Sequence, residues 1–213
     1  MAATQIDVFG DVSAGCDFLA QRSKPLAHAL KTIERPHIRK RKDGFAGLFR
    51  IIVEQQVSVP SAQAIWKRCC AATQPMSAKT VAGLGEEALR AMGLTRQKAH
   101  YVHQMALAIG RREFSFRPLP ALDDDGARDH LTQLKGVGPW SAGIYLLFCE
   151  GRIDIWPPGD IALEHAYGKA AQLEAKPTSQ HLNDLSQDWA PWRGLAAHIL
   201  WTYYAHIRGR TPI

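Results

Sequence analysis

Apolar residues recur every three or four positions along most of the chain, and stretches that alternate apolar and polar residues are nearly absent. The segment FAGLFRIIVEQQ shows this spacing, which places the following side chains on one helix face: Phe45, Leu48, Phe49, Ile52 and Val53. The same spacing predicts helices over residues 17–34, 45–56, 60–73, 78–93, 95–112, 127–134, 139–150, 160–172, 178–189 and 191–207. We therefore expect an all-α protein.

Residue types that favour helix starts support several of these boundaries. Ser58 and Pro60 stand at the start of the third helix, and Thr95 opens the fifth. Pro139 and Pro191 open two later helices, where the first turn needs no N–H group from proline.

Two segments are typical of linkers and divide the chain. Residues 34–44 contain a proline, a glycine and a basic cluster, and residues 112–126 contain two prolines and an acidic end. The remainder of the chain flanks the intervening helices on both sides. We therefore predict a central helical subdomain over approximately residues 45–135, a second subdomain built from residues 1–44 and 136–213, and a cleft between them.

Composition and charge narrow the class of protein. A chain of 213 residues with 46% hydrophobic and 22% charged residues is typical of a globular protein with a sizeable core. The net charge of +6 and the pI of about 9.3 make a polyanion such as nucleic acid a candidate partner. We interpret the basic cluster at residues 39–42 as a solvated loop that remains usable for phosphate contacts.

Several classes of site are disfavoured by the sequence. No apolar run is long enough to span a membrane and the first residues do not resemble a signal peptide, so we expect a cytoplasmic protein. The four cysteines have no metal-ligand or disulfide spacing, which indicates reduced, buried thiols. His100 and His103 share a helix face, but the sequence shows no companion acidic ligand, and we expect no transition-metal site.

The segment LKGVGP, residues 134–139, joins two predicted helices through a tight turn. Gly136 and Gly138 let the backbone approach a ligand closely, and Pro139 starts the next helix. Amides at a helix N-terminus favour an anion, so we expect the N–H groups of Val137 and Gly138 to point outward. A glycine that ends a helix before an ordinary loop is the alternative interpretation.

This hairpin resembles the helix-hairpin-helix element that grips a DNA phosphate backbone without reading bases. Together with PPGD, in which Asp160 lies twenty residues after Trp140, it resembles the signature of the helix-hairpin-helix DNA glycosylase superfamily, and within it the 3-methyladenine DNA glycosylase II branch. The stretches IIVEQQVSV, GLTRQKAHYVHQMA and WAPWRGLAAHILW agree with that branch. The resemblance implies two helical subdomains and a base-excision enzyme.

Asp160 has two compatible interpretations. Its position before IALEHAYGK favours a helix N-cap, and the resemblance implies the catalytic carboxylate. An anion there would stabilise the sugar, which becomes oxocarbenium-like as the base departs, and would help to align or deprotonate the attacking water. A purine alkylated on a ring nitrogen is already cationic, so a second catalytic acid is not obligatory; we interpret Asp154 and Glu164 as surface groups.

The residue at position 140 separates two reaction types. Relatives that also cut the DNA strand carry a lysine there, which forms a Schiff base with the sugar. Because this chain has Trp140, the resemblance implies a monofunctional glycosylase that uses water and leaves an abasic site.

Other site residues follow from the resemblance. Trp140, Trp201 and Tyr145 would line the pocket for the flipped base, and Gln56 with Val57 would fill the gap in the duplex. The hairpin would contact DNA through Lys135, Gly136, Val137, Gly138 and Ser141. A monovalent cation could be held by the backbone carbonyls of Thr132, Leu134 and Val137.

The remaining tryptophans Trp66, Trp189 and Trp192 are expected to pack in the protein interior. No cofactor is expected, and the cysteine ligands of an iron–sulfur cluster are missing near the C-terminus.

The sequence therefore predicts a monomeric glycosylase that removes alkylated purines of the 3-methyladenine type from double-stranded DNA. The alternatives are a non-catalytic helix-hairpin-helix DNA-binding module, a glycosylase/lyase for oxidised or mismatched bases, and a basic helical scaffold.

Overall fold

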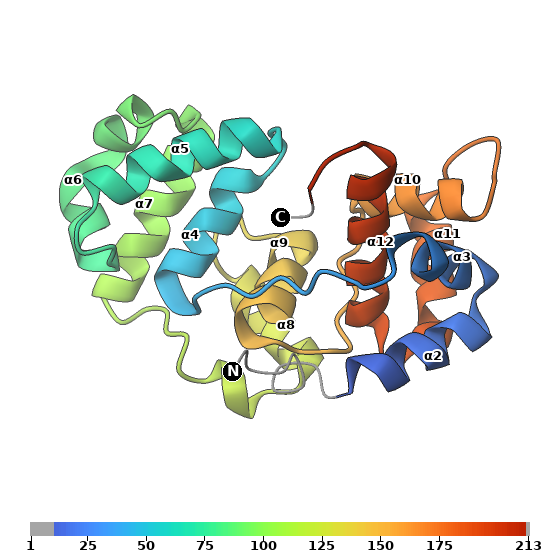
Figure 1. The fold of residues 1–213 in the computed structure, drawn as a ribbon. Coiled ribbons are helices and arrows are strands. Elements are labelled where there is room, and N and C mark those ends of the chain that lie inside the picture. Colours follow the sequence, from blue (N-terminus) through green and yellow to red (C-terminus); the bar gives the residue numbers. More distant parts are fainter. Residues whose placement is uncertain (1–10, 212–213) are drawn as a thin grey trace, which may run out of the picture. The chain divides into compact units, whose positions relative to one another are not determined.

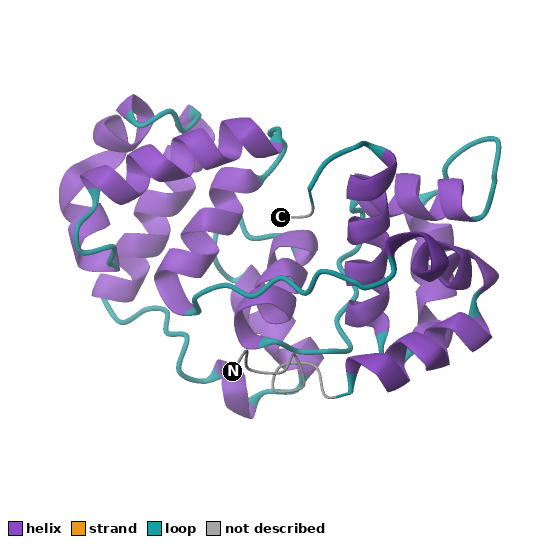
Figure 2. Cartoon of the chain, in the orientation of Figure 1, coloured by secondary structure: helices purple, strands orange, loops and turns teal. Residues whose placement is uncertain are grey.

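The computed structural model describes residues 11–211, and every regular element in this range is a helix (Figure 2). The all-α prediction is confirmed. The chain divides into a central unit, Arg41–Tyr145, and a terminal unit that combines Met1–Lys40 with Leu146–Ile213. The central unit ends at residue 145 rather than at the predicted residue 135, because the helix after the hairpin packs against helices of the central unit.

The central unit is built around its first helix, α4 (Figure 1). This helix packs against α5, α7 and α9 and contributes the fully buried side chains of Leu48, Phe49, Ile51 and Ile52. The unit comprises α4 (Gly44–Glu54), α5 (Val59–Ala72), α6 (Ala78–Ala91), α7 (Arg96–Gly110), η1 (Leu119–Ala121), α8 (Asp124–Thr132) and α9 (Pro139–Tyr145).

The terminal unit is built around the last helix, α12, which packs against α2, α3 and α10 (Figure 1). Residues 194–203 of α12 are all buried, as expected of a helix that is apolar on every side. The unit comprises α2 (Val12–Arg22), α3 (Lys24–Ile33), the π-helical turn η2 (Leu146–Glu150), α10 (Ile161–Ala170), α11 (Ser179–Ser186), η3 (Gln187–Trp189) and α12 (Arg193–Ile207).

Two of the predicted helices differ from those in the structure. The single helix expected over residues 17–34 is two helices, because Ser23 is extended and its side chain caps α3 by accepting the N–H of Leu26. The helix predicted from Pro191 begins two residues later, at Arg193. The caps predicted at Ser58 and Thr95 are confirmed.

Within residues 11–211, no helix combines the length and the apolar character that crossing a membrane requires. The three tryptophans expected in packing roles have them. Trp66 stacks edge-on against Phe49, Trp189 is buried beside Trp156, and Trp192 packs close to Gly15.

The packing around Gly194 of α12 leaves no room for a larger residue. A Cβ atom at this position would lie 2.5 Å from the carbonyl oxygen of Ile153 and 2.6 Å from Leu147 Cδ1. Because the first obstacle is backbone, Gly194→Ala should lower the free energy of unfolding by about 1–3 kcal/mol, measured by urea denaturation.

Gly83 provides the matched control, since it is an exposed helical glycine where an added Cβ atom would have no neighbouring atom within 4 Å. Gly83→Ala should leave the stability unchanged or raise it by up to about 1 kcal/mol. Equal effects of the two substitutions would contradict the packing described for α12.

Candidate active site and hairpin

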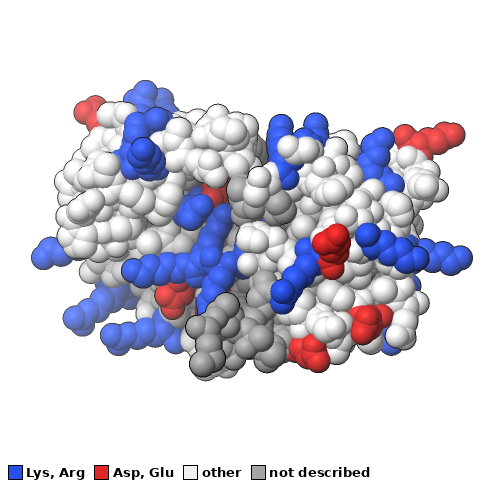
Figure 3. All heavy atoms as spheres, in the orientation of Figure 1, with Lys and Arg blue, Asp and Glu red and all other residues white. Residues whose placement is uncertain are grey.

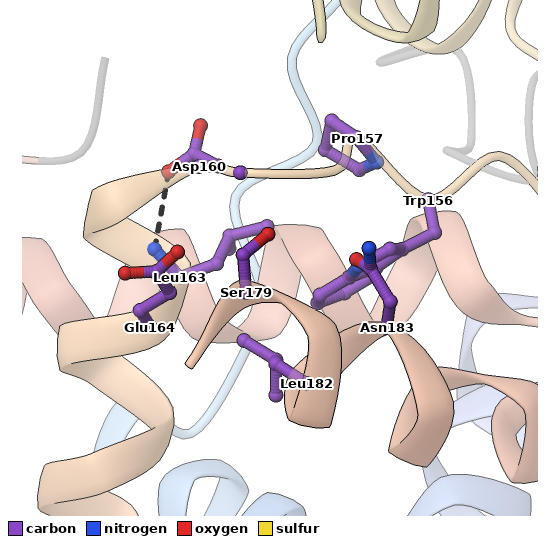
Figure 4. A pocket seen from close by; sticks show the side chains of 9 residues that line it. Trp156, Pro157, Asp160, Leu163, Glu164, Ser179, Leu182 and Asn183 are labelled. Atoms are coloured by element: carbon purple, nitrogen blue, oxygen red, sulfur yellow. Dashed lines mark hydrogen bonds between the residues drawn. The ribbon is translucent and has the colours of Figure 1, made fainter. Parts of the chain in front are cut away.

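Asp160 caps the N-terminus of α10, as predicted from its position in the sequence. Its Oδ1 atom accepts hydrogen bonds from the N–H groups of Ala162 at 2.9 Å and Leu163 at 3.1 Å. Figure 4 shows the second carboxylate oxygen directed away from the helix. The positive end of the helix therefore fixes the carboxylate and favours its negative charge.

The loop before Asp160 is held in place by contacts within the terminal unit. Asp154 accepts two hydrogen bonds from the guanidinium of Arg193, at 2.9 and 2.8 Å, and a third from its backbone N–H. The indole N–H of Trp156 donates to Asn183 Oδ1 at 3.0 Å. Because α11 and α12 both hold this loop, the position of Asp160 is set by the packed helices around it.

A shallow hollow lies beside Asp160 (Figure 4). Trp156, Ser179 and Asn183 contribute to its lining. In Figure 4 the second carboxylate oxygen of Asp160 points away from these side chains. The second carboxylate oxygen of Asp160 therefore does not point into this hollow.

The two neighbouring carboxylates are not the surface groups that the sequence suggested. Glu164 is 6% exposed and forms an ion pair with Lys176. Asp154 is the partner of Arg193 described above. Sequence spacing could not reveal either pairing, because each partner lies on a segment distant along the chain.

The hairpin contains one position that only glycine can occupy. Gly136 has a φ of +88°, and a Cβ atom there would lie 2.1 Å from the Tyr101 ring. Gly138 is exposed and has no such obstacle. The N–H of Val137 donates to the carbonyl of Leu134 at 3.0 Å, so the expectation that this amide points outward is wrong.

Gln55 is a functional candidate that the sequence interpretation missed. Its side-chain amide donates to the carbonyl of Gly136 at 3.0 Å and to Ser141 Oγ at 2.8 Å. Ser141 is only 3% exposed and its hydroxyl accepts this hydrogen bond inside the hairpin; its contact with DNA stays a prediction. The repeated glutamines in EQQVS were the available signal, but only the folded structure shows which one faces inward.

Lys98 anchors the end of α4 and the residue that follows it. Its ammonium group donates to the backbone carbonyls of Val53 and Gln55 at the end of α4, where a cation is favoured. Burial lowers the pKa of Lys98 below its ordinary value. The segment that follows α4 is therefore fixed both by Lys98 and by Gln55.

Gln56 and Val57, which were predicted to enter the duplex, directly follow Gln55. Gln56 is exposed and has a left-handed backbone with φ of +53°, and Val57 is an exposed apolar side chain. Such backbone conformations in residues other than glycine often occur at functional sites. The wedge role of both residues stays a prediction.

The carbonyls predicted to hold a cation lie in the same hairpin. The Leu134 carbonyl accepts the Val137 N–H, and the Thr132 hydroxyl donates to the Asp129 carbonyl. These bonds do not test the cation prediction. Lys135, also predicted to contact DNA, is exposed.

The three predicted pocket residues have different surroundings. Trp140 is half-buried at the start of α9. Tyr145 is 1% exposed, stacks on Phe116 and accepts the N–H of Gly44, and its pocket role stays a prediction. Trp201 belongs to the terminal unit, where the guanidinium of Arg39 lies over its ring.

The basic cluster at residues 39–42 is not uniformly solvated. Arg39 lies over aromatic rings, and Arg41 forms an ion pair with Glu54 at 2.6 Å. Lys40 and Lys42 are exposed. The interpretation of this cluster as a solvated loop therefore holds for its two lysines and is wrong for its two arginines.

His100 and His103 do have a companion carboxylate, which the sequence interpretation missed. Glu86 of α6 lies 2.8 Å from His100 Nδ1 and 3.7 Å from His103 Nδ1. The hydrogen bond from His100 lowers the pKa of Glu86. Across residues 11–211, no group of histidine, cysteine, aspartate and glutamate side chains is arranged to hold a metal ion.

Basic side chains are spread over the surface of both units. On the face drawn in Figure 3, lysine and arginine are more abundant than aspartate and glutamate. This distribution agrees with the net charge of +6 and is suited to contact with a polyanion.

Comparisons with known proteins agree with this architecture. Residues 49–191 match the family described as HhH-GPD superfamily base excision DNA repair protein. The Bacillus subtilis protein YfjP is 30% identical over 123 residues, which are 58% of this chain and 43% of that protein. DNA-3-methyladenine glycosylase 1 of Schizosaccharomyces pombe is 27% identical over 170 residues, which are 76% of this chain and 73% of that enzyme.

Among solved structures, the Schizosaccharomyces pombe 3-methyladenine DNA glycosylase in complex with abasic DNA has a similar fold. The TM-score is 0.78 at 21% identity, over 92% of this chain and 97% of that chain. The helical fold, the glycine hairpin and the downstream aspartate at a helix start are together typical of helix-hairpin-helix proteins. The chain belongs to the HhH-GPD superfamily of base excision DNA repair proteins.

The role of Gln55 can be tested by stability. Gln55→Ala leaves the Gly136 carbonyl and the Ser141 hydroxyl without this donor, so the free energy of unfolding should fall by about 1–3 kcal/mol in urea denaturation. Gln56→Ala removes an exposed neighbour and should change it by less than about 0.5 kcal/mol. The reverse order would show that Gln55 does not hold the hairpin.

Proposed function

We propose that this chain is a monofunctional DNA glycosylase that hydrolyses the N-glycosidic bond of alkylated purines in double-stranded DNA. It would act as a monomer and leave an abasic site for later repair steps. The family membership supports a base-excision role. The name of the fission-yeast relative supports 3-methyladenine-type lesions as the substrate class.

The geometry of Asp160 is the observation that carries this proposal. One carboxylate oxygen is held by two backbone N–H groups of α10, and the other is directed away from the helix. A carboxylate fixed in this way needs little reorganisation to stabilise a sugar carbon that becomes positive as the base leaves. The same oxygen would align or deprotonate the attacking water.

A single catalytic carboxylate suits a substrate whose leaving group is already cationic. An alkylated purine departs as a neutral base and does not need to be protonated first. Glu164 and Asp154 are each committed to an ion pair, with Lys176 and Arg193 respectively. We therefore assign the catalytic role to Asp160 and structural roles to these two carboxylates.

Trp140 supports hydrolysis over lyase chemistry. An amine at this position would attack the sugar and form a Schiff base, which an indole cannot do. In our proposal Trp140 instead offers an aromatic face to the flipped base, and Trp201 of the terminal unit is a second candidate for such a contact.

DNA would be gripped by the hairpin and opened by the loop after α4. We assign the backbone contact to Gly136, Gly138 and Lys135, with a monovalent cation on nearby carbonyls as a further phosphate contact. Gln56 and Val57, exposed on a loop fixed by Gln55, would occupy the space that the flipped nucleotide leaves.

Asp160→Asn separates the catalytic role of this residue from its capping role. Asparagine caps helices as well as aspartate does, so the fold should be kept while the negative charge is lost. Release of methylated purines from methylated duplex DNA should fall by about 10²- to 10³-fold, measured by mass spectrometry of the free bases. Binding to abasic DNA should be retained.

Asp184→Asn is the matched control, because Asp184 is an exposed aspartate on α11 in the same unit. It should release bases at the rate of the unchanged protein. Equal release by the Asp160 variant would remove the catalytic assignment, and binding without any release by the unchanged protein would favour a DNA-binding module. Borohydride added to the same reactions should trap no protein–DNA adduct; an adduct would indicate a glycosylase/lyase.

A further inference from the structure

Three aromatic rings of the terminal unit form a closely packed cluster. Phe148 belongs to η2, and His198 and Trp201 belong to α12. The ring centroids are 5.3 Å apart for Phe148 and Trp201, 5.4 Å for Phe148 and His198, and 5.6 Å for His198 and Trp201. Their exposed fractions are 2% for Phe148, 0% for His198 and 5% for Trp201.

Arg39 places a positive charge on this cluster. Its guanidinium carbon lies 5.2 Å from the centroid of the Trp201 ring and 5.6 Å from that of Phe148. Both distances are within the range of cation–π interactions, which are strongest on tryptophan. Arg39 thus holds the position over Trp201 where a cationic ligand would be most favoured.

The backbone around Arg39 is anchored to α12, so this placement is built into the fold. The N–H of His37 donates to Thr202 Oγ1 at 2.9 Å, and the N–H of Arg39 faces His198 Nδ1 at 3.5 Å. Alternate residues of the extended segment therefore turn their N–H groups toward the same helix. The side chain of Arg39 is half-buried and has the length to move while its backbone stays anchored.

His198 does not add a second charge to the cluster. Burial, with a further contribution from the charge of Arg39, lowers the pKa of His198 to about 3. The ring is therefore neutral near pH 7, with Nδ1 as the acceptor for the Arg39 N–H. The cluster presents electron-rich rings and one cation.

We propose that Arg39 is a specificity-determining residue, which cancels the preference of the Trp201 face for cationic bases. This inference rests on the proposed function and deepens it. A cationic purine that stacks on Trp201 gains a cation–π contact but brings its charge close to the guanidinium of Arg39, which repels it. A neutral purine gains no cation–π contact and meets no such repulsion.

The consequence concerns how alkylated bases are selected. With Arg39 in place, repulsion between the two cations offsets the cation–π contact, so the ring pair gives a cationic base little advantage over a neutral one. Selection of cationic lesions then arises mainly at the chemical step, because their glycosidic bond breaks more readily beside the carboxylate of Asp160. Removing the guanidinium should turn the ring pair into a true cation-binding surface.

The test compares two nucleosides on the full-length chain. 1-Methyladenosine carries a positive charge at neutral pH, and adenosine is its neutral counterpart. Binding of each is followed by NMR shifts of the Trp201 indole in the unchanged protein and in Arg39→Gln. Arg39→Gln should raise the affinity for 1-methyladenosine relative to adenosine by about 3- to 30-fold.

Three further variants test whether the gain depends on the charge of Arg39 and on the Trp201 ring. Arg39→Lys keeps the charge and should stay within about threefold of the unchanged protein. Trp201→Leu combined with Arg39→Gln should abolish the gain, with binding then followed by ligand-detected NMR. Arg39→Met replaces the glutamine variant if that protein does not fold, which far-UV circular dichroism would show.

An unchanged preference in both Arg39→Gln and Arg39→Met would overturn the proposal, and so would a gain that persists without Trp201. Nucleoside binding requires no catalysis. A protein that released no methylated base would therefore contradict the proposed function, while the binding ratios would still decide the role of Arg39.

Discussion

The proposed chemistry depends on one electrostatic arrangement, the carboxylate of Asp160 at the N-terminus of α10. Two backbone N–H groups orient one oxygen and favour negative charge on the group. A charge that is already oriented can stabilise a developing cation without first rearranging its surroundings. The capping interaction and the proposed catalytic role therefore use the same feature of the helix. Within the terminal unit, Arg193 and Asn183 hold the loop that leads to Asp160. Within the central unit, Gln55 holds the hairpin.

The sequence predicted features that depend on short spacings. Helical periodicity indicated the all-α class and most helix positions, and capping chemistry placed Ser58, Thr95 and Asp160 at helix starts. The break at Ser23 was signalled by a serine followed closely by proline, but the apolar periodicity continues through it and concealed it.

Features that depend on distant partners could not be predicted in this way. Glu164 was interpreted as a surface group because Lys176 lies on a later segment, and the hydrogen bond between Gln55 and Ser141 was missed because Gln55 lies far earlier in the chain. Arg39 was hidden in a run of basic residues that is typical of a solvated loop. Only the fold shows that its backbone follows α12 and that its guanidinium lies over Trp201.

The most direct test of the central claim measures affinity for the charge that Asp160 would stabilise. Duplex DNA with a cationic pyrrolidine in place of the sugar imitates the departing-base state, and duplex DNA with a neutral tetrahydrofuran abasic site is its reference. The unchanged protein should prefer the cationic duplex by about 10²-fold, and Asp160→Asn should lose most of this preference. The same preference in both proteins would contradict the role assigned to the carboxylate.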